Sequence, residues 1–315
     1  MDSKCKRLQD FYRELKIDYD VLAKSLVGML KEVVGDKPML LSIDRTDWEA
    51  RKNVVNLFVL SVCLGDAAQP LLWTDLRRKG NSTTAQRIEL VSRFIENFGR
   101  GRIEALVADR EFVGEEWFSW LLENNIPFAV RLKENFLTRR DESSRVKSAK
   151  DYFKGLQPGQ SMDLGLCEVC GVKMNVRGLR VEKKKELLVI GYSMMHGDKA
   201  QDVFMKRWNI ETGFQKLKSH GFNMEDSRLR GEGKYERLMA VLAVGFAWCY
   251  AVGHWSVTAV KPIRFIQKLM RPAACVFRRG LDLLCGVFHK ACPELRLVSR
   301  WAFEVLKNAF LFTPT

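Results

Sequence analysis

Four residues at fixed spacing combine a carboxylate with two cations. Phe204, Arg207, Glu211 and Lys218 stand at positions i, i+3, i+7 and i+14 of the segment FMKRWNIETGFQKLK. No proline interrupts this segment and its apolar residues recur at helical spacing, so the pattern predicts one helix over residues 204–218. The four side chains would form a stripe in which cations suited to phosphate flank a carboxylate. The alternative is a solvated edge with helical ion pairs of about 0.2–0.5 kcal/mol each.

Two aspartates follow short apolar runs. Met39–Ile43 predicts a strand that ends on Asp44, and Ile103–Ala108 predicts a strand that ends on Asp109. Adjacent strands could bring the two carboxylates together, and a packed helix could deliver Glu211. Three converging carboxylates repel one another, and Mg²⁺ relieves that repulsion because it prefers oxygen ligands while keeping waters for substrate. Taken singly, an aspartate at a strand end is more often a turn or cap residue.

The spacing F-x2-R-x3-E-x6-K resembles the Y-x2-R-x3-E-x6-K signature of bacterial insertion-sequence transposases of the DDE type. Two further blocks resemble that family in the same order, SIDRTDW at Ser42–Trp48 and VADREF at Val107–Phe112. The resemblance covers roughly residues 38–250. It departs from the signature at Phe204, which replaces the tyrosine, so any contact made by a tyrosine hydroxyl is lost.

The resemblance implies a DNA transposase that cleaves and joins strands at insertion-element ends by two-metal phosphoryl transfer. It implies Asp44, Asp109 and Glu211 as catalytic residues and metal ligands, with Mg²⁺ as cofactor and Mn²⁺ able to substitute. The partner would be double-stranded DNA, both terminal repeats and target, bound by a homodimer. The residues expected at the DNA are Arg207, Lys218, Phe204 and Arg110, although Arg110 could instead pair only with Glu111.

Neighbouring residues offer alternatives to these assignments. Asp47 and Glu111 lie two or three residues past the proposed ligands, but the family blocks align on the earlier aspartates. The resemblance also implies an insertion-domain aromatic that holds a flipped base. Phe153 and Tyr192 are both available for that role, and the sequence does not choose between them.

The bulk properties agree with a nucleic-acid partner. The 315 residues carry a formal charge of +14, which indicates a polyanionic ligand. A charged start and eight scattered cysteines predict reduced thiols in a cytoplasmic protein. The resemblance implies a bacterial, nucleoid-associated one. Residues 238–255 contain no Asp, Glu, Lys or Arg, as a membrane span would. Their internal Gly245 and Gly253 favour a buried helix, so we expect no membrane partner.

The element order predicts an α/β fold: a ribonuclease-H-like mixed sheet flanked by helices, a β-rich insertion and a helical C-terminal region. Three strands form an antiparallel meander, and later strands join in parallel. A helix from about Thr83 would be capped by Asn81 or Ser82. The expected divisions are 1–36, a short helical segment that could be a truncated DNA-binding region; 37–130, the first part of the core; 131–199, the insertion; 200–256, the second part of the core with the Glu211 helix; and 257–315, a basic helical region.

Two other functions remain compatible with these patterns. A truncated or repurposed derivative that binds DNA without transposing is favoured by the short N-terminal segment and by Phe204. A ribonuclease-H-fold nuclease acting on other substrates is the second, and the Arg207 and Lys218 pair argues against it.

Overall fold

The structure is a computed structural model that describes residues 3–14, 16–50, 53–140, 145–182, 186–207, 233–266 and 271–288. Between 207 and 233 it also describes positions 213–214, 217, 222, 224–227 and 229. Contacts divide the chain into two compact units. Unit 1 comprises residues 1–37, 46–79 and 209–315, and unit 2 comprises residues 38–45 and 80–208.

Unit 2 is built on parallel strands that continue into an antiparallel set. β4 (Ile103–Ala108) pairs in parallel with β1 (Met39–Ala50) on one side and with β5 (Phe128–Leu132) on the other. The remaining strands are β6 (Leu137–Arg139), β7 (Lys147–Ser148), β8 (Ser161–Val169), β9 (Val172–Arg180) and β10 (Leu187–Ser193). Because β10 pairs antiparallel with β5, the predicted insertion extends this sheet.

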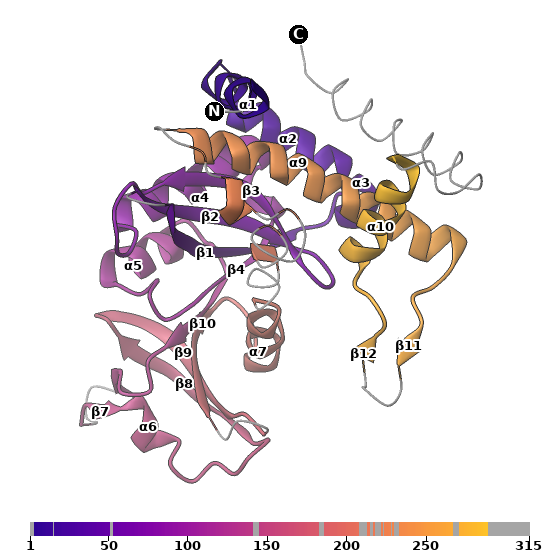
Figure 1. Cartoon of the computed structure of the whole chain (residues 1–315). Coiled ribbons are helices and arrows are strands. Elements are labelled where there is room, and N and C mark those ends of the chain that lie inside the picture. Colours follow the sequence, from indigo (N-terminus) through magenta and orange to yellow (C-terminus); the bar gives the residue numbers. More distant parts are fainter. Residues whose placement is uncertain are drawn as a thin grey trace. The chain divides into compact units, whose positions relative to one another are not determined.

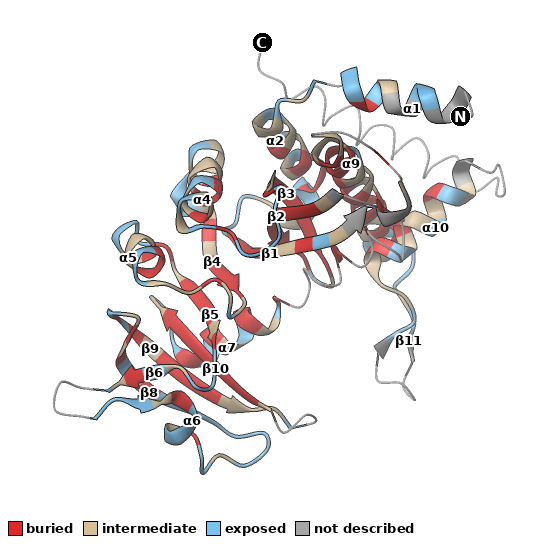
Figure 2. Ribbon diagram, turned by 60° about the vertical axis from the view of Figure 1, so that its left-hand side comes forward, coloured by how far each residue is buried: buried red, intermediate tan, exposed pale blue. Residues whose placement is uncertain are grey.

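The hydrogen-bonded strand order is β3-β2-β1-β4-β5-β10-β9-β8-β6-β7, a mixed sheet of ten strands. Figure 2 shows β4, β5 and β10 as largely buried, as expected of strands that are covered on both faces. The predicted α/β class with a mixed sheet and flanking helices is confirmed, and it agrees with a ribonuclease-H-like fold.

The helices of unit 2 are α4 (Thr84–Phe98), α5 (Glu115–Glu123), α6 (Ala149–Tyr152) and α7 (Gly197–Met205), with a short 3₁₀ turn at Arg100–Arg102 (Figure 1). Thr83 caps α4: its side chain accepts from Gln86 N, and the Gln86 side chain accepts from Thr83 N. This capping box satisfies two helix-end groups at once. The predicted caps, Asn81 and Ser82, are therefore wrong by one or two residues.

Unit 1 contains the antiparallel pair β2 (Asn53–Cys63) and β3 (Ala68–Asp75). Its helices are α1 (Ser3–Glu14), α2 (Tyr19–Met29), α3 (Lys31–Val34), α9 (Lys234–Trp255) and α10 (Val276–Phe288), with short helical turns at Met224–Ser227 and Ser256–Val260. In the described part of the chain, α9 with its extension is the one helix long and apolar enough to cross a membrane, yet 61% of that window is buried. It packs on α2, β3 and α10, which explains its apolar composition.

Two predicted helices are wrong in extent. The helix expected over 204–218 is interrupted: α7 runs from Gly197 to Met205, Lys206 and Arg207 form a turn, and the described positions Gly213, Phe214 and Leu217 are helical again. The region 257–315, expected to be helical, also contains a two-stranded hairpin, in which Phe265–Ile266 (β11) pairs antiparallel with Arg271–Pro272 (β12). Proline lacks an amide hydrogen and disfavours helix interiors, which accounts for the second case.

Candidate active site

One row of polar residues crosses the ends of three parallel strands of unit 2. The last registered pairs are Ile43 with Ala108 and Ala108 with Val130. The next residues along these strands are Asp44, Asp109 and Arg131. Since neighbouring strands lie about 4.8 Å apart and registered residues point to the same face, the two carboxylates and the guanidinium are neighbours.

Asp44 differs in one respect from its prediction. β1 does not end on this residue but runs on to Ala50, so Asp44 lies within a strand. What ends near it is the parallel pairing with β4, whose last pair is Ile43 with Ala108. The carboxylate is therefore held by a continuous strand, which fixes its position more firmly than a turn would.

The charge on Asp44 is poorly compensated. Burial raises the pKa of Asp44 to about 7, and the negative charges of Glu111 and Asp109 add to the rise. A hydrogen bond from Arg45 N to Asp44 Oδ1 (2.8 Å) and the charge of Arg207 act in the opposite direction. Like charges gathered in a buried place have this effect on a carboxyl group.

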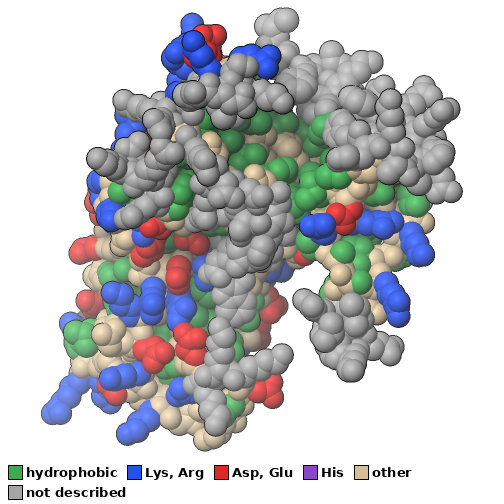
Figure 3. All heavy atoms as spheres, viewed as in Figure 1, with side chains coloured by type: hydrophobic (Ala, Val, Ile, Leu, Met, Phe, Trp, Pro, Cys, Tyr) green, Lys and Arg blue, Asp and Glu red, His purple; other side chains and the backbone are tan. Residues whose placement is uncertain are grey.

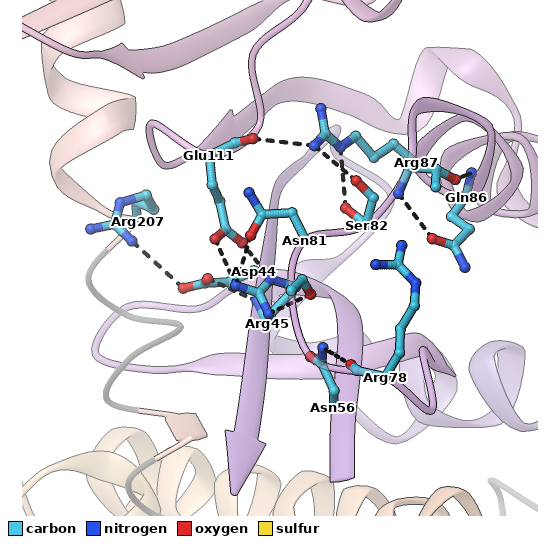
Figure 4. Close-up of polar contacts among 12 residues, drawn as sticks. Asp44, Arg45, Asn56, Arg78, Asn81, Ser82, Gln86, Arg87, Glu111 and Arg207 are labelled. Carbon is cyan, nitrogen blue, oxygen red and sulfur yellow. Dashed lines mark hydrogen bonds and ion pairs between the residues drawn. The ribbon is translucent and has the colours of Figure 1, made fainter. Parts of the chain in front are cut away.

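Arg45 and Glu111 form a clamp beside Asp44 (Figure 4). Arg45 Nε and Nη2 donate to the two Glu111 carboxylate oxygens, each at 2.8 Å. Buried Arg87 supports the clamp from behind, since its Nη2 donates to Glu111 O (3.1 Å) and to Ser82 O (3.0 Å). The Glu111 carboxylate is thus neutralised by a bidentate ion pair, and it is a poor candidate for a metal ligand.

The Asp109 carboxylate can accept a further hydrogen bond or a positive ligand. Its Oδ1 atom is buried and accepts no hydrogen bond from the described residues. The nearest cation is Arg131 Nη1 at 4.0 Å, and Arg131 already forms an ion pair with Glu186. A buried oxygen without a donor is costly, so this position favours a further positive group.

Arg207 approaches Asp44 from the turn that follows α7. Its Nη1 lies 3.6 Å from Asp44 Oδ2, and the side chain is only 4% exposed. The guanidinium carbon lies 5.7 Å from the centre of the Phe204 ring, which is itself buried. Both residues were expected at the DNA. The structure places Phe204 in the interior of unit 2 and Arg207 against the carboxylates.

The other half of the signature falls on residues of unit 1. Glu211 and Lys218 lie outside the described residues, and so does Trp208. Gly213, Phe214 and Leu217 are helical and buried. A Cβ built on Gly213 would lie 2.7 Å from Ala68 O, so only glycine fits this close approach, two residues after Glu211 in the sequence.

The remaining candidates are spread over the surface and the interior. Arg110 and Asp47 are exposed, and Arg110 forms no ion pair with any described residue, Glu111 included. The two insertion aromatics are both buried. Phe153 packs on Gly178, where a Cβ would lie 2.4 Å from the ring, and the Tyr192 hydroxyl donates to Asp163 Oδ1 at 2.9 Å. Neither ring offers a free face for a flipped base in this structure.

The residues that the sequence reasoning missed are Arg45, Arg87 and Arg131. Arg45 directly follows Asp44, and Arg131 occupies the strand position after Val130, so register alone would have found both. Among the residues that the structure describes, no three His, Cys, Asp or Glu side chains are grouped to hold a metal ion. The pair Asp44 and Asp109 nevertheless fits one, because hard oxygen donors meet there with too little positive charge.

One comparison with known protein families gives a match. A family model described as "Transposase DDE domain" matches residues 35–245. The match covers most of the chain and includes all three acidic residues singled out in the sequence. No curated protein matches the chain.

Proposed function

The chain belongs to the transposase DDE domain family, and we propose that it cleaves and joins DNA strands at the ends of an insertion element, with Asp44, Asp109 and Glu211 as its catalytic carboxylates. The observation that carries this proposal is the juxtaposition of Asp44 and Asp109 across β1 and β4. Family membership implies an enzyme that acts on DNA. The choice of residues, the two-metal chemistry and the Y-R-E-K subgroup are parts of the proposal.

The three carboxylates would hold two Mg²⁺ ions, with Mn²⁺ able to substitute. When bound, such ions activate a water or 3′-hydroxyl and stabilise the leaving oxygen. The chain's own residues have separate tasks. Asp44 in β1 and Asp109 directly after β4 would supply oxygen ligands, and Arg45 fixes Asp44 through its backbone N–H and neutralises Glu111.

Arg207 has a different task in this proposal from the one that its spacing suggested. Its guanidinium balances Asp44 within the protein, and it would turn to a phosphate when a metal ion takes over that charge. Arg110, which is exposed, and Lys218 are the proposed direct phosphate contacts. The partner is double-stranded DNA, both terminal repeats and target, bound by a homodimer. The proposed location is the bacterial cytoplasm, at the nucleoid.

The test is cleavage of linear DNA that carries the element's terminal sequences, with Mg²⁺ or Mn²⁺. Asp109→Asn and Glu211→Gln keep side-chain shape and remove a ligand, so each should reduce cleavage by at least about 10²–10³-fold. Exposed Asp47→Asn is the matched control and should cut like the wild type. Binding of the ends by a wild-type protein that never cuts them would instead support the non-transposing derivative. Equal cutting by all four proteins would refute the triad.

A further inference from the structure

A basic cavity adjoins Asp109 in unit 2. Its volume is about 320 Å³. Its walls are the loops that follow two parallel strands, Arg110 after β4 and the turn Lys133–Asn135 after β5, together with Lys150 of α6. In open α/β sheets, ligands bind at the carboxyl ends of the strands. The cavity therefore lies at the edge of the sheet where a substrate is expected.

Backbone hydrogen bonds hold the wall of this cavity in place. Phe136 N donates to Lys133 O at 2.9 Å and closes the turn after β5. Lys150 N donates to Glu134 O at 2.8 Å, and Ala149 N donates to Phe136 O at 2.8 Å. These bonds tie the turn to the start of α6, so Lys133 and Lys150 belong to one fixed wall.

Positive side chains outnumber negative ones in the lining of the cavity. Arg131 is committed to Glu186 and lies near Asp109. Arg110, Lys133 and Lys150 are exposed and form no ion pair with any residue in the described part of the chain. Glu134 is the one lining carboxylate left against these three cations. An excess of unpaired cations around a concave surface selects an anionic ligand.

We propose that this cavity binds backbone phosphates of the DNA strand beside the bond that is cleaved. The inference rests on the proposed function. Its volume is at the small end of ligand pockets, about 300–1,000 Å³, so it admits a sugar-phosphate unit and not a duplex. Lysine and arginine bind such phosphates without reading sequence. The cavity would hold the strand in register while Asp44 and Asp109 act on the neighbouring phosphate.

The charge of the surrounding surface argues for a local site. On the face of unit 2 seen in Figure 3, blue Lys and Arg side chains alternate with red Asp and Glu side chains. A mixed surface of this kind does not by itself attract DNA uniformly. Unpaired cations grouped around one hollow are therefore the feature that distinguishes this place.

The experiment compares two double variants of the full chain with the wild type. Lys133→Gln with Lys150→Gln removes two lining cations, and Lys154→Gln with Lys173→Gln removes two exposed lysines of unit 2 that do not line the cavity. The probe is a fluorescent duplex carrying an element end, bound by each protein over a range of salt concentrations. Each lost phosphate contact lowers the slope of log K against log salt by about 0.9.

The lining variant should lose roughly 1.8 from this slope and bind about tenfold more weakly, while the control variant keeps the wild-type slope. In cleavage, the lining variant should need more DNA for half-maximal rate and reach a near-normal rate at saturation. Unchanged or equally reduced slopes in the two variants would overturn the proposal. So would competition by inorganic phosphate or a mononucleotide as strong as that by DNA, since it would mark a small-anion site. A wild type that binds but never cuts would defeat the proposed function and leave the slope test intact.

Discussion

Unit 2 contains two clusters in which arginine meets aspartate, and they are built in opposite ways. Around Arg177, which joins β9 to its surroundings, every nitrogen of the guanidinium has an acceptor. Nε donates to Gln201, Nη1 to Asp163, and Nη2 to Ser161 and Asp198. Around Asp44 and Asp109, by contrast, the cations stand at 3.6 and 4.0 Å and one buried oxygen has no donor among the described residues.

The difference separates a structural role from a reactive one. Asp163 accepts hydrogen bonds from both Arg177 and Tyr192, one on each carboxylate oxygen, so this carboxylate is already satisfied within the protein. Even Gly197 at the start of α7 is required there, since a Cβ would lie 2.3 Å from an Asp163 oxygen. The Asp44 row keeps carboxylate oxygens that its own cations do not satisfy. Perturbed, under-compensated groups of that kind cluster at functional sites.

Asp44→Asn should give the largest effect and the clearest contrast. Cleavage should fall by at least about 10²–10³-fold, while the free energy of unfolding stays equal or rises because a like-charge repulsion is removed. Single-turnover kinetics measure the cleavage rate, and urea denaturation measures the free energy of unfolding. A large loss of stability would mean that Asp44 is structural and would erase the distinction between the clusters.

Arg177→Met should have the opposite profile. It leaves Asp163 without its cation, and we expect a loss of about 2–4 kcal/mol in unfolding free energy, below the full cost of a buried pair because Asp163 is 40% exposed. Lys173→Met on the same strand is the control and should change stability by less than about 0.5 kcal/mol. The folded fraction should cleave normally. A loss below that of the control would show that the saturated cluster contributes nothing.

Glu111→Gln tests the clamp formed by Arg45 and Glu111. Its effects should lie between those of Asp44→Asn and Arg177→Met. It removes one charge from the bidentate pair with Arg45, which should cost about 1–2 kcal/mol of stability. Cleavage should fall less than tenfold, because Arg45 N still holds Asp44 and no metal ligand is lost. A loss as large as that of Asp44→Asn, measured in the same cleavage assay, would make Glu111 a ligand and not a partner of arginine.

The sequence predicted the strands that carry the site better than the contacts made there. The apolar run Ile103–Ala108 placed β4 correctly, because burial on both faces leaves a continuous hydrophobic signature. The pairing register of β1 and β4 then brings Asp44 beside Asp109. The spacing of the two residues in the sequence does not predict that proximity. The prediction of one continuous helix over 204–218 was wrong for a physical reason. Hydrophobic periodicity does not detect a turn such as Lys206–Arg207 when the apolar spacing continues beyond it.

The DNA-facing residues were harder to predict for a related reason. Phe153 and Tyr192 were expected from residue type and Phe204 from its place in the signature spacing. An aromatic side chain is at least as useful in a core as on a ligand, and all three are buried. Arg207 was chosen by spacing, and its ion pair with Asp44 depends on a fold that spacing does not encode. In the Arg177 cluster the polar groups have hydrogen-bond partners, whereas the Asp44 row contains a buried oxygen without one among the described residues. This difference can be recognised only when the partners of each group are known.

Tyr192→Phe should produce the smallest effect and settles what the insertion aromatic does. The change removes only the hydroxyl that donates to Asp163, so unfolding free energy should drop by about 0.5–1.5 kcal/mol. Because Arg177 still satisfies that carboxylate, the cluster should survive, and cleavage of element ends should be unchanged. Urea denaturation and a cleavage assay on the same preparation measure both quantities. If cleavage fell while stability stayed constant, the hydroxyl would act on DNA, and the saturated cluster would have to open during the reaction.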